Sequence, residues 1–203
     1  MPKPTVFTKE QILDAAFAIF KEEGIGNISA RKLAARMGSS TAPIYTSFKN
    51  IEDIQTLLLE RALSLLLEYT EKEYTVNIFL NIGVGMLEFA RDYKILYRTL
   101  FMESSEHQYI LQEFFQKSLL QMEKEKTLKI FNEKELTDIL RKMEIFTHGM
   151  AAFLCAGMLE DESRDFFVHT LNETGAEVIS AAAYRKGVLE QFITLNEKGG
   201  CES

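Results

Sequence analysis

The sequence predicts an all-α protein of about nine helices, with an N-terminal three-helix helix-turn-helix domain and a C-terminal helical bundle. All three prolines of the 203 residues lie within the first 43 positions, so no helix breaker interrupts the rest of the sequence. Apolar residues recur there at intervals of three and four, the spacing of one face of a helix. Several of the predicted helices also begin at a residue that favours the N-cap position.

The first helix is expected to begin at Thr8, a favourable N-cap with Gln11 three residues later, as in a capping box. Phe7 can pack on Ile12 as a hydrophobic staple, and apolar residues continue at helical spacing for about four turns. Gly24 then marks the end of the helix.

Two short helices are expected next. Ser29 is a natural N-cap for a helix over Ala30–Met37, which a glycine then ends. A third helix begins at Ser40 or Thr41. It must be short, because Asn50 is the N-cap of the following helix.

From residue 50 onward the apolar spacing remains helical over most of the sequence. The predicted helices cover residues 50–73, 78–91, 93–102, 105–128, 135–159 and 165–185 or beyond. The breaks between them fall at polar or charged residues. The sequence contains no internal repeat and no low-complexity segment.

Composition argues against a membrane or secreted protein. The longest uncharged apolar run, residues 150–159, has ten residues, whereas a membrane-spanning helix needs about 20. The first residues lack the apolar core of a signal peptide, and Cys155 and Cys201 do not make a disulfide framework. We therefore expect a protein of the reducing cytoplasm with no membrane partner.

Charge is distributed unevenly along the sequence. The whole chain carries −7, whereas residues 1–50 carry seven basic and four acidic side chains, a net charge of +3. The remainder therefore carries −10. A phosphate-binding module on an acidic body explains this pattern, because only the contacting face must be positive. Local fluctuation of charge is the alternative explanation.

The sequence ARKLAARMGSSTAPIYTSF has the spacing of a helix-turn-helix. Ala34 is small where the two helices would cross, and Gly38 permits the turn between them. Leu33 and Ile44 are spaced to pack inward. The second helix of such a motif presents its N-terminal residues, here 40–43, to base edges in the major groove. A helical hairpin in another kind of bundle is the alternative.

The segment from Phe7 to Ile54 resembles the N-terminal DNA-binding domain of the TetR family of bacterial transcriptional regulators. It matches in order an amphipathic helix ending in glycine, the N-capped sequence SARKLAARMG, a turn, a recognition helix ending in IYTSF, and an N-capped long helix. The resemblance covers roughly residues 7–60. The rest of the chain matches the family only in length and helicity.

This resemblance implies that the N-terminal helices contact double-stranded operator DNA. The residues facing the bases would be Thr41, Ala42, Pro43 and Ser47, next to Ser40, which the helix-turn-helix spacing places at the same end of the helix. The residues contacting phosphates, or a base edge in the case of arginine, would be Ser29, Arg31, Lys32, Tyr45 and Lys49. Two positions depart from the family pattern. Ile51 replaces a common lysine, so one phosphate contact is expected to be missing, and Thr46 replaces a bulkier residue.

The resemblance also implies a ligand cavity between the long helices of the C-terminal part. Aromatic and methionine side chains suit an apolar or aromatic effector of small size. The candidate wall residues are Met86, Phe89, Tyr93, Tyr97, Phe101, Phe114, Phe146, His148 and Met150. Ordinary packing in the bundle core is the alternative for each of them.

His148 lies one turn after Glu144 on a predicted apolar helix, so the two side chains can share a face and a hydrogen bond. A metal site would need further ligands, and His107 and His169 do not have a suitable spacing. We therefore expect a polar pair, with no metal and no cofactor.

The last two predicted helices carry small residues at intervals that allow close packing. The resemblance implies a homodimer in which these helices pair with the same two helices of a second chain. The interface would contain Gly149, Ala152, Ala156, Leu171, Gly175, Val178 and Ala182. Close packing within one chain is the alternative.

Together these observations predict a DNA-binding domain over residues 1–50 and a ligand-binding and dimerisation domain over 51–203. The expected function is that of a ligand-responsive repressor, bound to operator DNA as a homodimer and released by a small apolar or aromatic effector. The alternative is an architectural or partner-binding DNA-binding protein without an inducer. An enzyme is not expected, because no Ser/His/Asp set, glycine phosphate loop or metal cluster has the required spacing.

Overall fold

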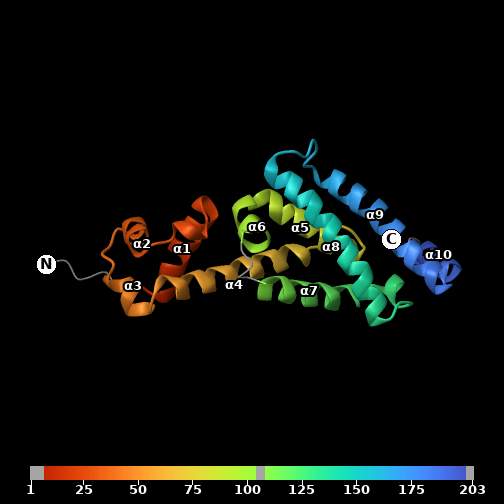
Figure 1. Cartoon of the computed structure of the whole chain (residues 1–203), viewed down its shortest axis with the longest axis horizontal. Helices are drawn as coiled ribbons and strands as arrows, with labels where there is room; N and C mark the ends of the chain where they lie inside the picture. Colours follow the sequence, from red (N-terminus) through yellow and green to blue (C-terminus); the bar gives the residue numbers. More distant parts are fainter. Residues whose placement is uncertain (1–6, 104–107, 200–203) are drawn as a thin grey trace. The chain divides into compact units, whose positions relative to one another are not determined.

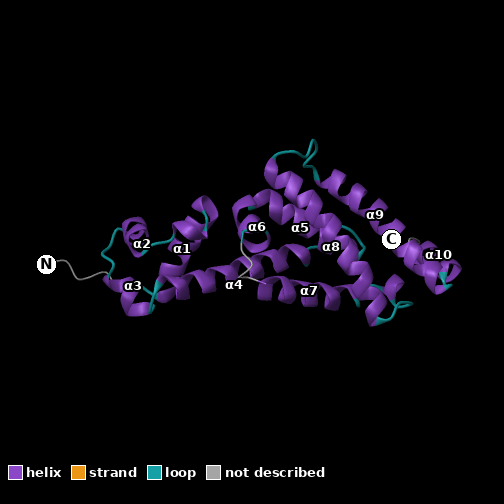
Figure 2. Ribbon diagram, in the orientation of Figure 1, coloured by secondary structure: helices purple, strands orange, loops and turns teal. Residues whose placement is uncertain are grey.

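The computed structural model describes residues 7–103 and 108–199, which form ten α-helices and no β-strand (Figures 1 and 2). The all-α prediction is therefore confirmed. The helices are α1 (Lys9–Glu23), α2 (Ala30–Met37), α3 (Ala42–Ser47), α4 (Ile51–Thr70), α5 (Ile78–Asp92), α6 (Lys94–Phe101), α7 (Gln108–Met122), α8 (Glu133–Ala156), α9 (Arg164–Lys186) and α10 (Leu189–Gly199). Short 3₁₀ turns follow α1 and α7, namely η1 (Ile25–Asn27) and η3 (Lys126–Leu128). None of the helices in these ranges is long and apolar enough to cross a lipid bilayer.

The described residues group into two compact units. The N-terminal unit takes those within Met1–Leu65 and Tyr93–Ile110, and the C-terminal unit takes those within Leu66–Asp92 and Leu111–Ser203. The N-terminal unit thus contains α1 to α3, most of α4, and α6. The C-terminal unit contains α5, most of α7, and α8 to α10.

The first two helices begin and end where the sequence predicts them. The Thr8 hydroxyl accepts the backbone N–H of Gln11 at 3.2 Å, and the Gln11 side chain accepts the backbone N–H of Thr8 at 2.9 Å. At the start of α2, the Ser29 hydroxyl accepts the backbone N–H of Lys32 at 3.2 Å. These bonds satisfy N–H groups that have no partner within the helix, so they fix both starting points.

The N-terminal unit has an apolar core to which every one of its helices contributes. Phe20 of α1, Leu33 of α2, Ile44 of α3 and Leu58 of α4 are fully or almost fully buried. Tyr97 of α6 is also buried. Burial of these side chains removes the apolar face of each short helix from water, which holds the helix in place.

In the C-terminal unit, α5 packs against α8 and α9, which also pack against each other. The end of α4 approaches α5 very closely. A Cβ atom at Gly85 would lie only 2.3 Å from the Tyr69 carbonyl oxygen, so glycine is required at this crossing.

A buried carboxylate joins α5 to the start of α9. Glu88, which is 3% exposed, accepts a hydrogen bond from Arg91 at 2.5 Å and one from Arg164 at 3.2 Å. Arg91 also donates to the backbone carbonyl of Glu162 at 3.2 Å, in the segment that precedes α9. This network ties the loop between α8 and α9 to α5.

Three of the later helices differ from their predicted ranges. α8 ends at Ala156 rather than at residue 159, because Gly157 adopts a left-handed φ of 69°. The helix expected over 105–128 is α7, which ends at Met122, and its expected start at Ser105 lies outside the described residues. Gly187, with a φ of 78°, ends α9, and α10 follows as a tenth helix that the prediction of about nine omitted.

Candidate DNA-binding site and candidate ligand cavity

A left-handed glycine turn joins α2 to α3. Gly38 has a φ of 62°, its N–H donates to the Ala35 carbonyl at 3.2 Å, and the N–H of Ser39 donates to the Ala34 carbonyl at 2.9 Å. Pro43 lies in the first turn of α3, where a missing N–H removes no helical hydrogen bond. The two helices and their turn form the predicted helix-turn-helix.

One face of α3 is fixed to the core of the N-terminal unit. Ile44 in the helix and Phe48 directly after it are both buried. The ammonium group of Lys9 lies 5.1 Å from the centre of the Phe48 ring, a cation–π contact. Because this face is anchored, the opposite side of α3 is presented in a defined orientation.

The outward side of the helix-turn-helix carries the residues predicted to contact DNA. The exposed ones are Ser29, Arg31, Ser40, Thr41, Ala42, Tyr45 and Lys49, and the partly buried ones are Lys32, Pro43 and Ser47. Thr41 is the N-cap residue of α3, yet its hydroxyl makes no capping hydrogen bond. Both Thr41 and Tyr45, one turn later, therefore present a hydroxyl group to solvent.

Two ion pairs join α2 to the end of α1. Arg36 donates two hydrogen bonds of 2.7 Å to Glu22, and these bonds lower the pKa of the Glu22 carboxyl. Lys32 pairs with Glu23. The positive charges of Lys32 and Arg36 are thus partly neutralised within the N-terminal unit.

Arg31 and Lys49 differ from those two residues, because neither makes an ion pair with a residue of the described ranges. Both are exposed, Arg31 on α2 and Lys49 just after α3. Their uncompensated charge makes them the residues on this surface best able to bind phosphate oxygens.

The C-terminal unit contains a cavity of about 330 Å³. Its wall comes from the start of α5, from α7, η3, α8 and α9, and from α10. The larger apolar residues of the wall are Phe79, Ile82, Met86, Phe114, Leu128, Leu140, Met143, Leu171, Ile179 and Phe192. Such an apolar, concave site of this size is typical of small-molecule binding.

Few polar groups interrupt this wall. Glu144 is the one ionisable side chain among the described residues that form it, and burial raises the pKa of its carboxyl to about 7. Ser118 is 2% exposed, and its hydroxyl has no hydrogen-bond partner within the described part of the chain. The Thr147 hydroxyl, in contrast, donates to the Met143 carbonyl at 2.8 Å.

Residues 12–55, which contain α2, the turn, α3 and most of α1, match the family model described as bacterial regulatory proteins, tetR family. This part of the chain is a TetR-family DNA-binding domain. The predicted family is confirmed, and with it a DNA-binding helix-turn-helix of a transcriptional regulator. No curated protein matches the sequence.

Solved structures of TetR-family regulators share the fold of this chain. A tetR-family transcriptional regulator from Streptomyces coelicolor has 13% identity and a TM-score of 0.73, over 91% of this chain and 87% of its own. A TetR-like transcriptional regulator from Rhodococcus sp. RHA1 has 13% identity and a TM-score of 0.61, over 87% and 98%. PfmR from Thermus thermophilus has 15% identity and a TM-score of 0.52, over 83% and 95%. At these identities the likeness concerns the fold.

Two of the residues predicted to bind a ligand lie in the cavity wall, namely Met86 and Phe114. Phe89 is buried elsewhere in the C-terminal unit, its ring 5.8 Å from that of Tyr69. The remaining candidates do not line the cavity. They are Phe146, His148 and Met150 on α8, and Tyr93, Tyr97 and Phe101 in the N-terminal unit.

The Glu144–His148 pair was expected to share one face of a helix. Glu144 lines the cavity, whereas His148 does not, and burial lowers the pKa of the His148 imidazole to about 4. The imidazole is therefore uncharged at neutral pH. The described residues contain no group of three or more His, Cys, Asp or Glu side chains arranged to hold a metal ion.

Most of the wall residues were not predicted from the sequence. They occupy shared helix faces, namely residues 79, 82, 83 and 86 on α5, 140, 143, 144 and 147 on α8, and 171, 175 and 179 on α9. These intervals of three and four are visible in the sequence. The sequence does not indicate which apolar faces surround a space and which ones pack together.

Two of the residues predicted at a dimer interface face into their own chain. Leu171 and Gly175 are buried and line the cavity, and a Cβ atom at Gly175 would lie 3.7 Å from Cε of Met143. Both residues therefore pack within their own chain, and the small size of Gly175 leaves room for Met143. The others occupy exposed or partly exposed positions on α8 and α9, namely Gly149, Ala152, Ala156, Val178 and Ala182.

Proposed function

We propose that this protein is a ligand-responsive transcriptional repressor that binds operator DNA as a homodimer and releases it when a small apolar effector occupies the cavity. The observation that carries the proposal is the outward side of α3, where Thr41, Ala42 and Tyr45 are exposed while Ile44 anchors the helix. A short helix that is fixed on one side and exposed on the other suits insertion into the major groove.

Within this proposal, the residues around α3 divide by their chemistry. The Thr41 hydroxyl and the Ala42 methyl group can reach base edges from the N-terminal end of the helix. The Tyr45 phenol and the charges of Arg31 and Lys49 suit phosphate oxygens. The base contacts would then set sequence preference, and the phosphate contacts would set register and overall affinity.

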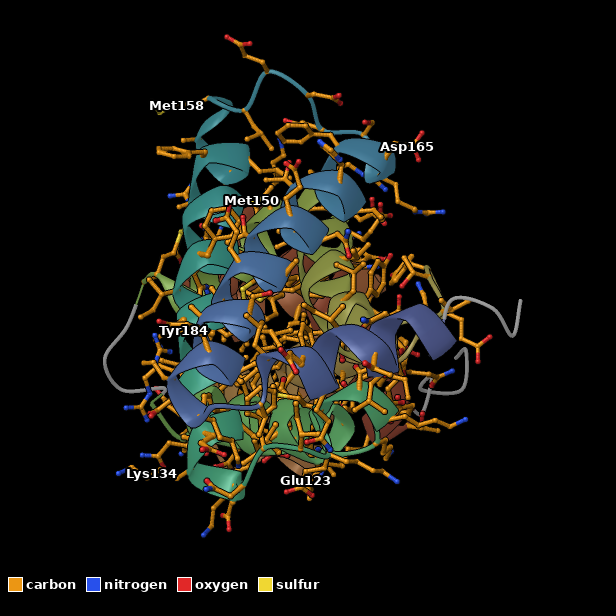
Figure 3. The ribbon with its side chains drawn as sticks, turned by 90° about the vertical axis from the view of Figure 1, so that its right-hand side faces the viewer. Glu123, Lys134, Met150, Met158, Asp165 and Tyr184 are labelled. Atoms are coloured by element: carbon orange, nitrogen blue, oxygen red, sulfur yellow. The ribbon has the colours of Figure 1, made fainter. Side chains whose placement is uncertain are left out.

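The proposed dimer uses the outward faces of α8 and α9. Ile145 and Phe153 of α8, 68% and 54% exposed, lie two turns apart with Gly149 between them, and Tyr184 of α9 is 74% exposed. In Figure 3, α8 and α9 lie on the side that faces the viewer. Met158 is labelled just beyond the end of α8, and Tyr184 near the end of α9. Large apolar side chains at the surface favour burial against a second copy of the same helices.

α8 can couple the cavity to this interface. Met143 and Thr147 line the cavity from one side of the helix, whereas Ile145 and Phe153 are exposed on another. A ligand that displaces α8 would therefore change the surface presented to the partner. Regulation requires only that the effector binds one dimer arrangement more tightly than the other.

Selection from a random duplex library tests the DNA-binding part of the proposal. Enriched duplexes should contain two half-sites related by two-fold symmetry, because a symmetric dimer presents two copies of α3. At one fixed salt concentration, affinity for an enriched duplex should exceed that for a scrambled duplex by at least about 10³-fold. Equal binding of both duplexes would contradict the proposal and favour the architectural alternative, in which phosphate contacts bind DNA of any sequence.

A thermal-shift screen of small apolar compounds tests the effector part. A compound that binds the folded protein raises its Tm with concentration, and the same compound should release the enriched duplex. Gly175→Leu is the control, since the new side chain would point toward the flexible end of Met143 and fill part of the cavity. This variant should bind DNA without responding to the compound. Compounds that bind the wild type and leave DNA binding unchanged would contradict ligand-responsive control.

A further inference from the structure

We infer that the cavity of the C-terminal unit binds an apolar amine in its protonated, cationic form, with the Glu144 carboxylate as counter-ion. We further infer that this amine is the effector, and that part rests on the proposed function. Binding of the amine is a separate claim with its own measurement.

Glu144 supplies the charge. It is the single ionisable residue among those described in the wall, and no residue of the described ranges forms an ion pair with it. Arg141, one turn earlier, is exposed, and its guanidinium carbon lies 5.8 Å from the centre of the Phe115 ring. Arg141 still lowers the cost of ionising Glu144, but the two side chains form no ion pair. A partly buried carboxyl remains costly to ionise in this setting, so a cationic ligand that pairs with it directly gains affinity.

Ser118 belongs to the wall, but its hydroxyl oxygen is closed off from the cavity space. Its hydroxyl lies on α7, almost completely buried, and no described group accepts or donates a hydrogen bond to it. Buried hydroxyl groups in proteins normally have a partner. The Thr127 and Thr147 hydroxyls of the same wall are already bonded, to Glu125 at 3.3 Å and to the Met143 carbonyl at 2.8 Å. Ser118 therefore adds no polar contact to the cavity space, and the inference depends on Glu144.

The rest of the wall suits an apolar cation. Phe79, Phe114 and Phe192 contribute three aromatic rings, whose faces attract a cation. Met86 and Met143 add flexible, polarisable side chains that adapt to an apolar body. A carboxylate-bearing ligand would place two negative charges in one poorly solvated space, which disfavours acids.

Three probes of similar size test the charge preference. They are 4-tert-butylbenzylamine, the neutral 4-tert-butylbenzyl alcohol and the anionic 4-tert-butylbenzoate, each titrated calorimetrically into the full-length protein at pH 8. The amine should bind at least about tenfold more tightly than the alcohol, the equivalent of one charge-assisted hydrogen bond. The benzoate should bind most weakly of the three.

Variants identify the residues responsible. Glu144→Gln keeps the size of the side chain and should remove the preference for the amine over the alcohol. Ser118→Ala should leave binding of the amine close to that of the wild type, because the Ser118 hydroxyl oxygen is closed off from the cavity space. Glu173→Gln is the matched control, because Glu173 is an exposed carboxylate of α9 outside the cavity. It should bind all three probes as the wild type does, and circular dichroism checks the fold of each variant.

The pH dependence of amine binding gives a second readout. The groups lining the cavity from α5, α7, α9 and α10 are uncharged, and Arg141 of α8 is the charged neighbour that affects Glu144. Because burial raises the pKa of Glu144 to about 7, more of this carboxyl is ionised at pH 8 than at pH 6. Affinity for the amine, protonated at both values, should therefore increase several-fold from pH 6 to pH 8, and this increase should be absent in Glu144→Gln.

The possible outcomes separate this inference from the proposed function. If the alcohol or the benzoate bound as tightly as the amine, or if the amine did not bind, the inference would be overturned. An uncharged compound that binds and releases operator DNA would overturn the inference and leave the proposed function intact. An amine that binds through Glu144 and leaves operator DNA bound would support the inference and contradict the proposed effector control.

Discussion

Thr41 and Tyr45 lie one turn apart on the outward side of α3, and their substitutions should weaken DNA binding in different ways. Thr41→Ala removes a hydroxyl that is not used to cap the helix. It should cost about 1–3 kcal/mol on the enriched duplex and leave binding to scrambled DNA nearly unchanged. Tyr45→Phe removes a phosphate donor and should weaken both duplexes by a similar factor. Fluorescence-anisotropy titrations at one salt concentration measure both effects.

Thr46→Ala is the matched control for this pair. The Thr46 hydroxyl donates to the Ala42 carbonyl at 2.9 Å within α3, so its loss should not change the preferred sequence. If Thr41→Ala bound both duplexes with wild-type affinity, α3 would not read sequence at this position. The architectural alternative would then gain support.

A substitution at Gly85 should lower the stability of the protein. Gly85→Ala places a Cβ atom 2.3 Å from the Tyr69 carbonyl oxygen, and the backbone atoms that meet it cannot rotate away. We expect the free energy of unfolding to fall by about 1–3 kcal/mol or more. Gly26→Ala is the control, because a Cβ atom there meets nothing within 4 Å. Equal stability of the two variants in urea unfolding would contradict the close approach of α4 and α5.

At the scale of elements, Glu88 holds the start of α9 to α5. Glu88→Gln leaves Arg91 and Arg164 without their carboxylate, and we expect a loss of about 2–3 kcal/mol in the free energy of unfolding. This is less than for a fully buried pair, because Arg164 is 54% exposed. Glu173→Gln removes the exposed pair with His169 and should cost less than about 1 kcal/mol. Similar losses in both variants would show that the buried network contributes no more than a surface pair.

Local signals allowed the helix starts to be predicted from the sequence, because capping depends on residues only three positions apart. Thr8 with Gln11, and Ser29 with the Lys32 backbone, make the expected bonds. The sequence did not predict the boundary between α9 and α10. α9 ends because Gly187 adopts a left-handed backbone conformation, which the apolar spacing around it does not indicate.

The cavity was harder to predict, because it depends on how distant helices pack. Aromatic and methionine content pointed to Met86 and Phe114, which line the cavity, but equally to Tyr97, which belongs to the core of the N-terminal unit. Gly175 was interpreted by its small size as an interface residue, whereas its neighbour is Met143 of the same chain. Composition and size describe a side chain, and the opposing helix decides what it contacts.

At the scale of the whole molecule, the proposed homodimer makes its own prediction. Phe153→Glu places a charge on the outward face of α8, where burial against a second chain would be costly. The dimer dissociation constant should increase at least about tenfold, and operator affinity should fall with it. Leu120→Glu is the control, since Leu120 is similarly exposed but lies on α7. Sedimentation showing the same dimer for both variants would place the interface elsewhere.

A hydroxyl-radical footprint of the wild-type protein on an enriched duplex tests the central claim most directly, because it reports where α3 and its symmetry mate contact one DNA molecule. A homodimer reading two major grooves should protect two patches whose centres lie about one helical turn apart, or a multiple of 10–10.5 base pairs. The two patches should have matching patterns of protection. A single patch, or even protection along the whole duplex, would contradict recognition of an operator by two helix-turn-helix modules.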